Sequence, residues 1–173
     1  YVQHMLRDFR RSGVDKDEAT RNKIKKLNDE IIQIGQTFEK NIREGSRKLI
    51  LNSIKDLEGM PQDYIDQHQP NAEGKIVLTT AYPDYNPFMQ YAKSDALRKQ
   101  YYVLFRQQAY PQNREVLMNL MQKRYELARI LGYNNFAEFV TADKMIKSPT
   151  NAQEFIDKVS AIAAGKSKRE YQV

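Results

Sequence analysis

Two histidines are the side chains best suited to chemistry in this sequence, because imidazole can bind zinc or act as a general base. His4 is followed by Met5-Leu6-Arg7-Asp8, so the second histidine that a helical zinc motif needs four residues later is absent. His68 lies beside Gln69-Pro70, in a segment predicted to be a surface loop. Neither histidine belongs to a recognisable catalytic motif, and we interpret both as bystanders.

Other common sites are also missing from the sequence. No cysteine is present, which excludes disulfides, thiolate metal sites and a cysteine nucleophile. The seven glycines occur one by one, so there is no glycine-rich phosphate loop. Grouped carboxylates such as Asp15, Asp17 and Glu18 are better explained by favourable charge at the start of a helix. The sequence therefore predicts no catalytic, cofactor-binding or metal-binding residue in this chain.

The net charge of +6 raises nucleic acid or an anionic surface as a partner. The strongest basic cluster contains Arg7, Arg10, Arg11, Lys23, Lys25 and Lys26. Acidic residues are interspersed with these cations, and helix faces of mixed sign are ordinary in globular proteins. We therefore favour a solvated helix face over a nucleic-acid footprint, and nucleic acid is not an expected partner.

Most tyrosines fall in one stretch of the sequence: Tyr82, Tyr85, Tyr91, Tyr101, Tyr102, Tyr110 and Tyr125. A tyrosine-rich surface can bind peptide, because the ring is apolar and its hydroxyl can donate or accept a hydrogen bond. Packing between helices is the simpler interpretation, and we predict that these rings belong mainly to the core.

Hydrophobic periodicity predicts a mainly α-helical fold that begins with a long antiparallel hairpin. Residues 2–11 have helical spacing and end at Gly13, a suitable C-terminal cap. Residues 16–44 form a long amphipathic helix, capped by Asp15 or Asp17, with one narrow apolar seam: Ile24, Leu27, Ile31, Ile34, Phe38 and Ile42. We expect these two helices to pack together as in a coiled coil.

A small β ribbon is predicted from residues 48–52 and 75–80, the second of which is rich in β-branched side chains. Two strands alone are marginal, so we expect the ribbon to lie against helices. The remaining residues are predicted to form further packed helices. The expected organisation is one helical region over 1–173, with a hairpin (1–44), ribbon and turns (45–82) and a helical subdomain (83–173).

The order of these pieces resembles the N-terminal region of the thimet oligopeptidase family, which includes oligopeptidase A and the bacterial dipeptidyl carboxypeptidase. The resemblance covers nearly the whole chain. Its most specific stretches are Leu57-Glu58-Gly59-Met60-Pro61, then Ile76-Val77-Leu78-Thr79-Thr80-Ala81-Tyr82-Pro83-Asp84-Tyr85-Asn86-Pro87-Phe88, then Arg124-Tyr125-Glu126-Leu127-Ala128-Arg129-Ile130-Leu131-Gly132-Tyr133.

The resemblance implies a two-lobed, mostly helical zinc metallopeptidase whose deep channel admits short peptides. In that family a His-Glu-x-x-His helix and a downstream Glu hold the zinc in the C-terminal half. This sequence lacks the motif, so no family residue is carried over to any position here. We expect a non-catalytic fragment that forms part of the channel wall and limits substrate size. Its expected partners are the C-terminal catalytic half of the same chain and short peptides, with zinc bound only in the parent protein.

Both ends of the chain support that expectation, since it begins at Tyr1 rather than Met and stops inside a helical pattern. The alternative is a stand-alone basic helical interaction module that uses residues 2–44 to bind nucleic acid or an acidic protein. The sequence has no apolar run of the roughly 18 residues that a membrane helix needs. We expect a cytoplasmic protein, with a periplasmic or exported location left open.

Overall fold

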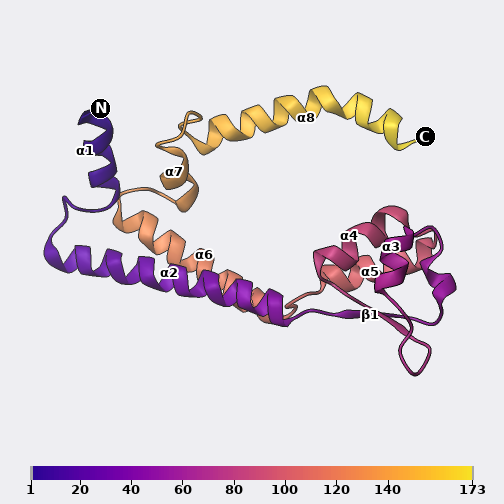
Figure 1. Cartoon of the computed structure of the whole chain (residues 1–173). Helices are drawn as coiled ribbons and strands as arrows, with labels where there is room; N and C mark the ends of the chain where they lie inside the picture. Colours follow the sequence, from indigo (N-terminus) through magenta and orange to yellow (C-terminus); the bar gives the residue numbers. More distant parts are fainter. Residues whose placement is uncertain (1, 173) are drawn as a thin grey trace. The chain divides into compact units, whose positions relative to one another are not determined.

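The computed structural model describes residues 2–172, which are mainly helical with one small sheet, as predicted (Figure 1). In chain order the elements are α1 (Val2–Arg11), α2 (Glu18–Glu44), β1 (Lys48–Leu51), a 3-10 turn (Ile54–Leu57), α3 (Gln62–Gln67), β2 (Ile76–Thr79), α4 (Tyr82–Tyr91), α5 (Asp95–Arg106), α6 (Gln112–Ile130), α7 (Phe136–Thr141) and α8 (Pro149–Tyr171). No helix in the described part of the chain is long and apolar enough to cross a membrane.

Polar side chains at the helix starts explain several of these boundaries. The Asp17 carboxylate accepts hydrogen bonds from the Thr20 N–H at 2.9 Å and from the Thr20 hydroxyl at 2.7 Å, so Asp17 caps α2. Ser94 accepts from the Leu97 N–H at 3.3 Å at the start of α5. These bonds satisfy backbone donors that have no partner inside the helix. The chain leaves α1 at Gly13, whose φ of +80° suits a residue without a Cβ.

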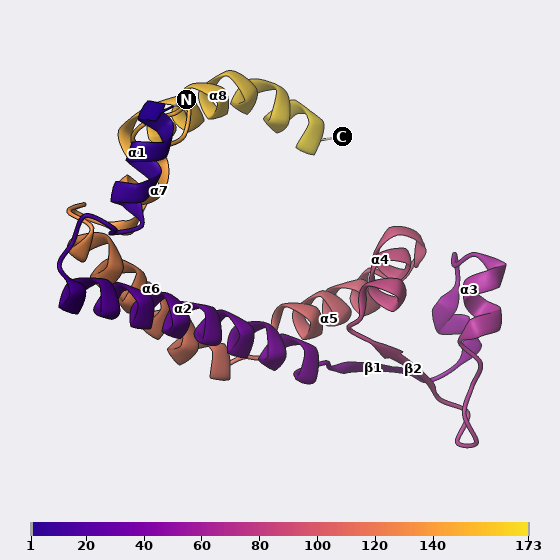
Figure 2. The same ribbon diagram turned by 60° about the vertical axis from the view of Figure 1, so that its left-hand side comes forward.

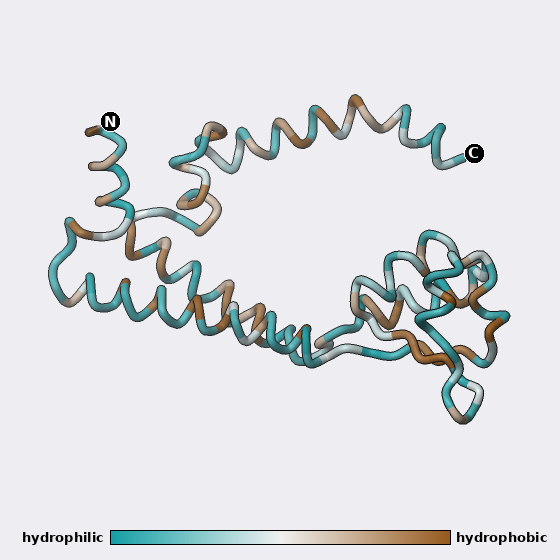
Figure 3. Tube along the Cα trace, viewed as in Figure 1, coloured by the Kyte–Doolittle hydropathy of each residue, from teal (hydrophilic) through white to brown (hydrophobic). Residues whose placement is uncertain are grey.

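The predicted ribbon is confirmed. β1 and β2 pair antiparallel, with Leu49 opposite Leu78 and Leu51 opposite Ile76. Side chains alternate between the two faces of a strand, and these four lie on the same face, each at most 1% exposed. The strands are a hydrophobic part of the trace, and α4 and α5 lie beside them (Figures 2 and 3). Burial of each side chain contributes roughly 1.5–3 kcal/mol, which a free ribbon would lack.

Aromatic side chains from α4 and α5 cover the buried face of the ribbon. Phe88 and Tyr101 are fully buried, and their rings meet edge to face with centroids 5.4 Å apart. The Tyr101 hydroxyl donates a hydrogen bond to the Thr79 carbonyl oxygen at the end of β2. Tyr101 therefore contributes both apolar area and a polar tether to the strand.

The apolar seam of α2 packs against α6, which corrects the expected pairing with residues 2–11. Ile24 and Leu27 are buried together with Leu127 of α6. In both ribbon views α6 runs alongside α2 (Figures 1 and 2). The ten-residue α1 is too short to cover a helix of 27 residues, and half of the Leu6 and Phe9 surfaces stays exposed.

A hydrogen-bond network joins α3, β2 and α4. The Asp84 carboxylate accepts from the Thr79 N–H at 2.8 Å and from the Thr79 hydroxyl at 2.6 Å. His68 Nε2 lies 3.2 Å from the other Asp84 carboxylate oxygen, and His68 Nδ1 lies 2.8 Å from the Tyr64 carbonyl oxygen. Both partners are acceptors, so the arrangement is fully satisfied when both ring nitrogens donate. His68 follows α3 and its side chain is only 13% exposed, so the predicted surface position is wrong.

The network lowers the pKa of Asp84. Burial raises the pKa of this carboxyl, but the hydrogen bonds from Thr79 and His68 outweigh burial and bring it below the ordinary value of 3.8. Burial, helped by the Asp84 charge, raises the pKa of the Tyr64 hydroxyl. That hydroxyl donates to the Asp84 carbonyl oxygen at 2.8 Å, so it stays protonated at neutral pH.

Contacts within the chain define two compact units. One comprises the chain up to Gln33 and again from Leu120, and the other is Ile34–Asn119. The ribbon, its covering helices and the Asp84 network all belong to the second unit, whereas the Ile24, Leu27 and Leu127 cluster belongs to the first.

Truncating the ribbon core will destabilise the Ile34–Asn119 unit. Leu49→Ala removes a side chain with no exposed surface, so we expect a loss of about 2–5 kcal/mol in the free energy of unfolding. Ile50→Ala, on the same strand but 57% exposed, is the matched control and should cost less than about 1 kcal/mol. Urea unfolding followed by circular dichroism measures both values. Equal losses would contradict the described register.

Asp84→Asn will destabilise the same unit at neutral pH by about 1–2 kcal/mol, because an amide cannot accept all of the hydrogen bonds that the carboxylate accepts. A carboxyl whose pKa is lowered by folding adds stability above its unfolded pKa and loses it as pH falls through the folded value. The native chain should therefore lose stability below about pH 4, and the variant should lose less. Urea midpoints between pH 7 and pH 3 test this. Asp63→Asn, exposed on α3, should match the native chain.

Candidate functional site

His4 and His68 belong to different compact units of the chain. His4 is exposed on α1, and both ring nitrogens of His68 face protein acceptors, so metal binding there would require breaking the Asp84 network. Across residues 2–172, no group of three or more His, Cys, Asp or Glu side chains could hold a metal ion. The zinc implied by the resemblance therefore has no fitting set of ligands among the described residues.

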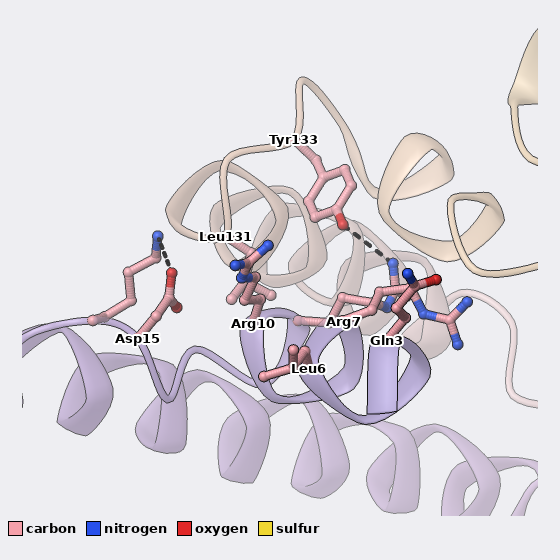
Figure 4. A pocket seen from close by; sticks show the side chains of 9 residues that line it. Gln3, Leu6, Arg7, Arg10, Asp15, Leu131 and Tyr133 are labelled. Atoms are coloured by element: carbon pink, nitrogen blue, oxygen red, sulfur yellow. Dashed lines mark hydrogen bonds and ion pairs between the residues drawn. The ribbon is translucent and has the colours of Figure 1, made fainter. Parts of the chain in front are cut away.

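The arginines of the predicted basic cluster do come together. Arg7, Arg10 and Arg11 project from α1 into a cavity of about 360 Å³, and Lys16, Leu131 and Tyr133 also line it (Figure 4). This cavity lies within the unit formed by the two ends of the chain. Lys23, Lys25 and Lys26 of α2 do not line it, so only the arginines of the predicted cluster share this cavity.

Local partners use much of the positive charge around this basic cavity. Arg11 lies 3.4 Å from the Asp143 carboxylate, donates to the Tyr133 hydroxyl at 3.3 Å and sits 4.4 Å above the Phe139 ring. Burial raises the pKa of Asp143, but the charges of Arg11 and Lys144 bring it below its ordinary value. Arg11 therefore acts as a structural bridge from α1 to the region around α7.

Two further cations of the cluster, Arg7 and Lys26, and the neighbouring Lys16 lie close to carboxylates. Arg7 lies 3.1 Å from Asp8. Lys16 lies 3.4 Å from Asp15, which is labelled in Figure 4. On α2, Lys26 lies 3.9 Å from Glu30. Exposed pairs of this kind contribute about 0–1 kcal/mol. These contacts agree with the predicted solvated face of mixed charge.

The tyrosines divide between core and surface, so the prediction of a mainly buried set is wrong. Tyr85 and Tyr101 are buried. The exposed ones, at 45–67%, are Tyr82, Tyr91, Tyr102, Tyr110 and Tyr125. The buried rings belong to the core around the ribbon. Of the exposed ones, Tyr110 lies in the turn between α5 and α6 and the other four lie on helices.

A second cavity, of about 550 Å³, lies in the Ile34–Asn119 unit, where the end of α2, the start of α4 and the end of α5 meet. Arg43 and Arg106 line it together with Ser46, Tyr82 and Phe105. Sequence reasoning missed this site, because its members come from three separate segments and belong to no motif. The only hint was the tyrosine-rich stretch, which contains Tyr82.

The chain is similar in sequence to known peptidases. Residues 88–173 match the model of Peptidase family M3. Saccharolysin of Saccharomyces cerevisiae is 31% identical over 100% of this chain and 25% of its own length. Oligopeptidase A of Haemophilus influenzae is 28% identical over 99% of this chain and 27% of its own length. Oligopeptidase A of Escherichia coli is 27% identical over 98% of this chain and 27% of its own length.

The matches are similar in extent. The chain spans about a quarter of the length of these curated relatives, while almost all of its own length is matched. Across its whole length, the chain is therefore homologous to part of the oligopeptidases of peptidase family M3.

Proposed function

We propose that this chain is a non-catalytic part of a zinc-dependent oligopeptidase, forming a portion of the channel wall that limits substrate size. The observation that carries the proposal is the homology over the whole chain to about a quarter of each relative. In this proposal, residues outside the chain hold the zinc and activate the water that attacks the peptide bond. The residues described here supply architecture and contact the substrate.

The surface of α8 supports a role within a larger fold. This helix has 23 residues and buries none of them. Its apolar side chains Phe155, Ile156, Val159 and Ile162 are 48–74% exposed and recur at helical spacing. A continuous apolar stripe of this kind marks an interaction surface. We assign it to packing against the remainder of the longer oligopeptidase.

The face of α1 adds to this argument. Val2, Met5, Leu6 and Phe9 are 41–66% exposed, and Leu6 and Phe9 line a further cavity of about 330 Å³ beside Val14. An amphipathic helix that buries no residue obtains little stability from its own unit. Contact with additional chain would give α1 the burial that it lacks here.

The alternative interaction module has weaker support. Its basic residues Arg7, Arg11 and Lys16 each have a carboxylate partner, which reduces the charge available for phosphate groups. Nucleic-acid binding would also show a steep dependence on salt. The homology over the whole chain favours the oligopeptidase proposal over the module.

The chain alone will neither cleave peptides nor bind zinc stoichiometrically. We expect no zinc-dependent cleavage of a quenched fluorescent peptide, and no retained zinc after dialysis, as measured by atomic absorption. The double variant His4→Ala and His68→Ala is the control. Zinc-dependent cleavage by the native chain that disappears in this control would contradict the proposal.

Polar substitution on the α8 stripe will leave the chain itself stable but block its assembly. Ile156→Glu alters a side chain that is 55% exposed, so the free energy of unfolding should change by less than about 0.5 kcal/mol. Association with the remaining part of the oligopeptidase, followed by analytical ultracentrifugation, should weaken at least tenfold, by about 1.4 kcal/mol or more. Ser160→Glu, an exposed polar position on α8, is the control. If Ile156→Glu associates as tightly as the native chain, the α8 stripe does not pack against the remaining part of the oligopeptidase.

A further inference from the structure

The 550 Å³ cavity of the Ile34–Asn119 unit combines two cations with an aromatic wall. Arg43 reaches it from the last turns of α2, and Arg106 is the last residue of α5. None of the described residues that line it is acidic. A cavity with this charge favours an anionic group, because guanidinium groups donate charge-assisted hydrogen bonds in a geometry that matches a carboxylate.

Both guanidinium groups retain donors for a ligand. The contacts of Arg106 with the protein are to ring faces, 5.1 Å from the Tyr102 centroid and 5.9 Å from that of Phe105. Arg43 lies 4.0 Å from the Glu39 carboxylate, and both side chains of that pair are mostly exposed. Such a pair is worth about 0–1 kcal/mol, so Glu39 competes weakly with a ligand.

The apolar wall of this cavity is well supported. The Tyr82 ring is 67% exposed and meets the Phe105 ring edge to face, with centroids 5.7 Å apart. Behind it, Tyr85 stacks on Phe105 at 3.9 Å. Aromatic rings fixed by their neighbours offer apolar area at a small entropic cost. An apolar group beside the anion would find this surface already formed.

The Ser46 hydroxyl adds a neutral polar group to the cavity. It lies 3.4 Å from the Thr80 hydroxyl, which is itself buried and accepts from the Arg47 N–H at 2.9 Å. Thr80 therefore helps to orient Ser46. The cavity volume is within the range of about 300–1,000 Å³ that is typical of small-ligand sites.

We infer that this cavity binds the terminal carboxylate of a short peptide whose last side chain is aromatic or aliphatic. The carboxylate lies between Arg43 and Arg106, and the side chain packs on Tyr82 and Phe105. The choice of a peptide rests on the proposed function, whereas the choice of an apolar carboxylate rests on the cavity itself.

The test is a titration of the isotope-labelled 173-residue chain, followed by NMR. The ligands are an acetylated tripeptide ending in phenylalanine with a free carboxylate, the same tripeptide as a carboxamide, and a carboxamide tripeptide with a central aspartate. Signals of Ser46, Tyr82 and Arg106 should shift with the first ligand. The first carboxamide should bind at least about tenfold more weakly, because a charge-assisted hydrogen bond is lost.

Variants locate the site. Arg106→Gln and Arg43→Gln should each weaken binding of the free-carboxylate peptide at least about tenfold. Lys40→Gln removes the same charge from α2 at a residue outside the cavity, and should change the affinity less than about twofold. Circular dichroism of each variant checks that the fold is intact.

Equal binding of the free acid and the first carboxamide would overturn the inference, as would unchanged affinity in Arg106→Gln. Tighter binding of the aspartate peptide than of the free acid would also overturn it, in favour of an acidic side chain as the ligand. These failures would leave the channel-wall proposal standing. Failure of that proposal would instead appear as zinc-dependent cleavage by the chain alone, with peptide binding at Arg43 and Arg106 unaffected.

Discussion

The Ile34–Asn119 unit depends on burying one face of a two-stranded ribbon. A ribbon of two strands is marginal in water, and here the leucine and isoleucine side chains on one face are closed off by α4 and α5. The same packing brings Tyr101 to the carbonyl of Thr79 and places Asp84 against the Thr79 N–H. Apolar burial and these two hydrogen bonds thus fix the junction of β2 and α4, where Tyr82 lies.

That junction also sets the geometry of the second cavity. Arg47, just before β1, donates to the Gln107 carbonyl at 3.0 Å and to the Tyr110 carbonyl at 3.3 Å, which holds the end of α5 against the ribbon. Its backbone N–H binds the Thr80 hydroxyl. These hydrogen bonds of Arg47 to backbone carbonyls fix the end of α5, where Arg106 lines the same cavity as Ser46.

The unit formed by the two chain ends has a different physical character. Its buried cluster is small, with Ile24, Leu27 and Leu127 at its centre and the Lys123–Glu30 ion pair at 2.8 Å beside it. Arg11 and Asp143 add a polar bridge. Neither α1 nor α8 buries a residue. This imbalance between helix surface and burial underlies our proposal that further chain covers these helices.

The sequence predicted the individual helices and strands better than it predicted which of them pack together. Alternation and β-branched content identified the strands, and spacing identified the α2 seam, because both patterns are local. Spacing shows which face of a helix is apolar but not which helix covers it, so Leu127 was not foreseen as the partner of Ile24. His68 and Arg106 were missed for a related reason: their environments are assembled from segments far apart in the chain. The family resemblance came from an ordered set of short motifs, and the whole-chain homology confirms it.

The most direct test of the central claim is reconstitution of peptidase activity from two polypeptides. The 173-residue chain is mixed with the remaining part of the longer oligopeptidase, and zinc-dependent cleavage of a quenched fluorescent peptide is followed. We expect activity to appear only in the mixture and to rise to saturation as the chain is added. Full activity of the remaining part alone, unchanged by adding the chain, would contradict it.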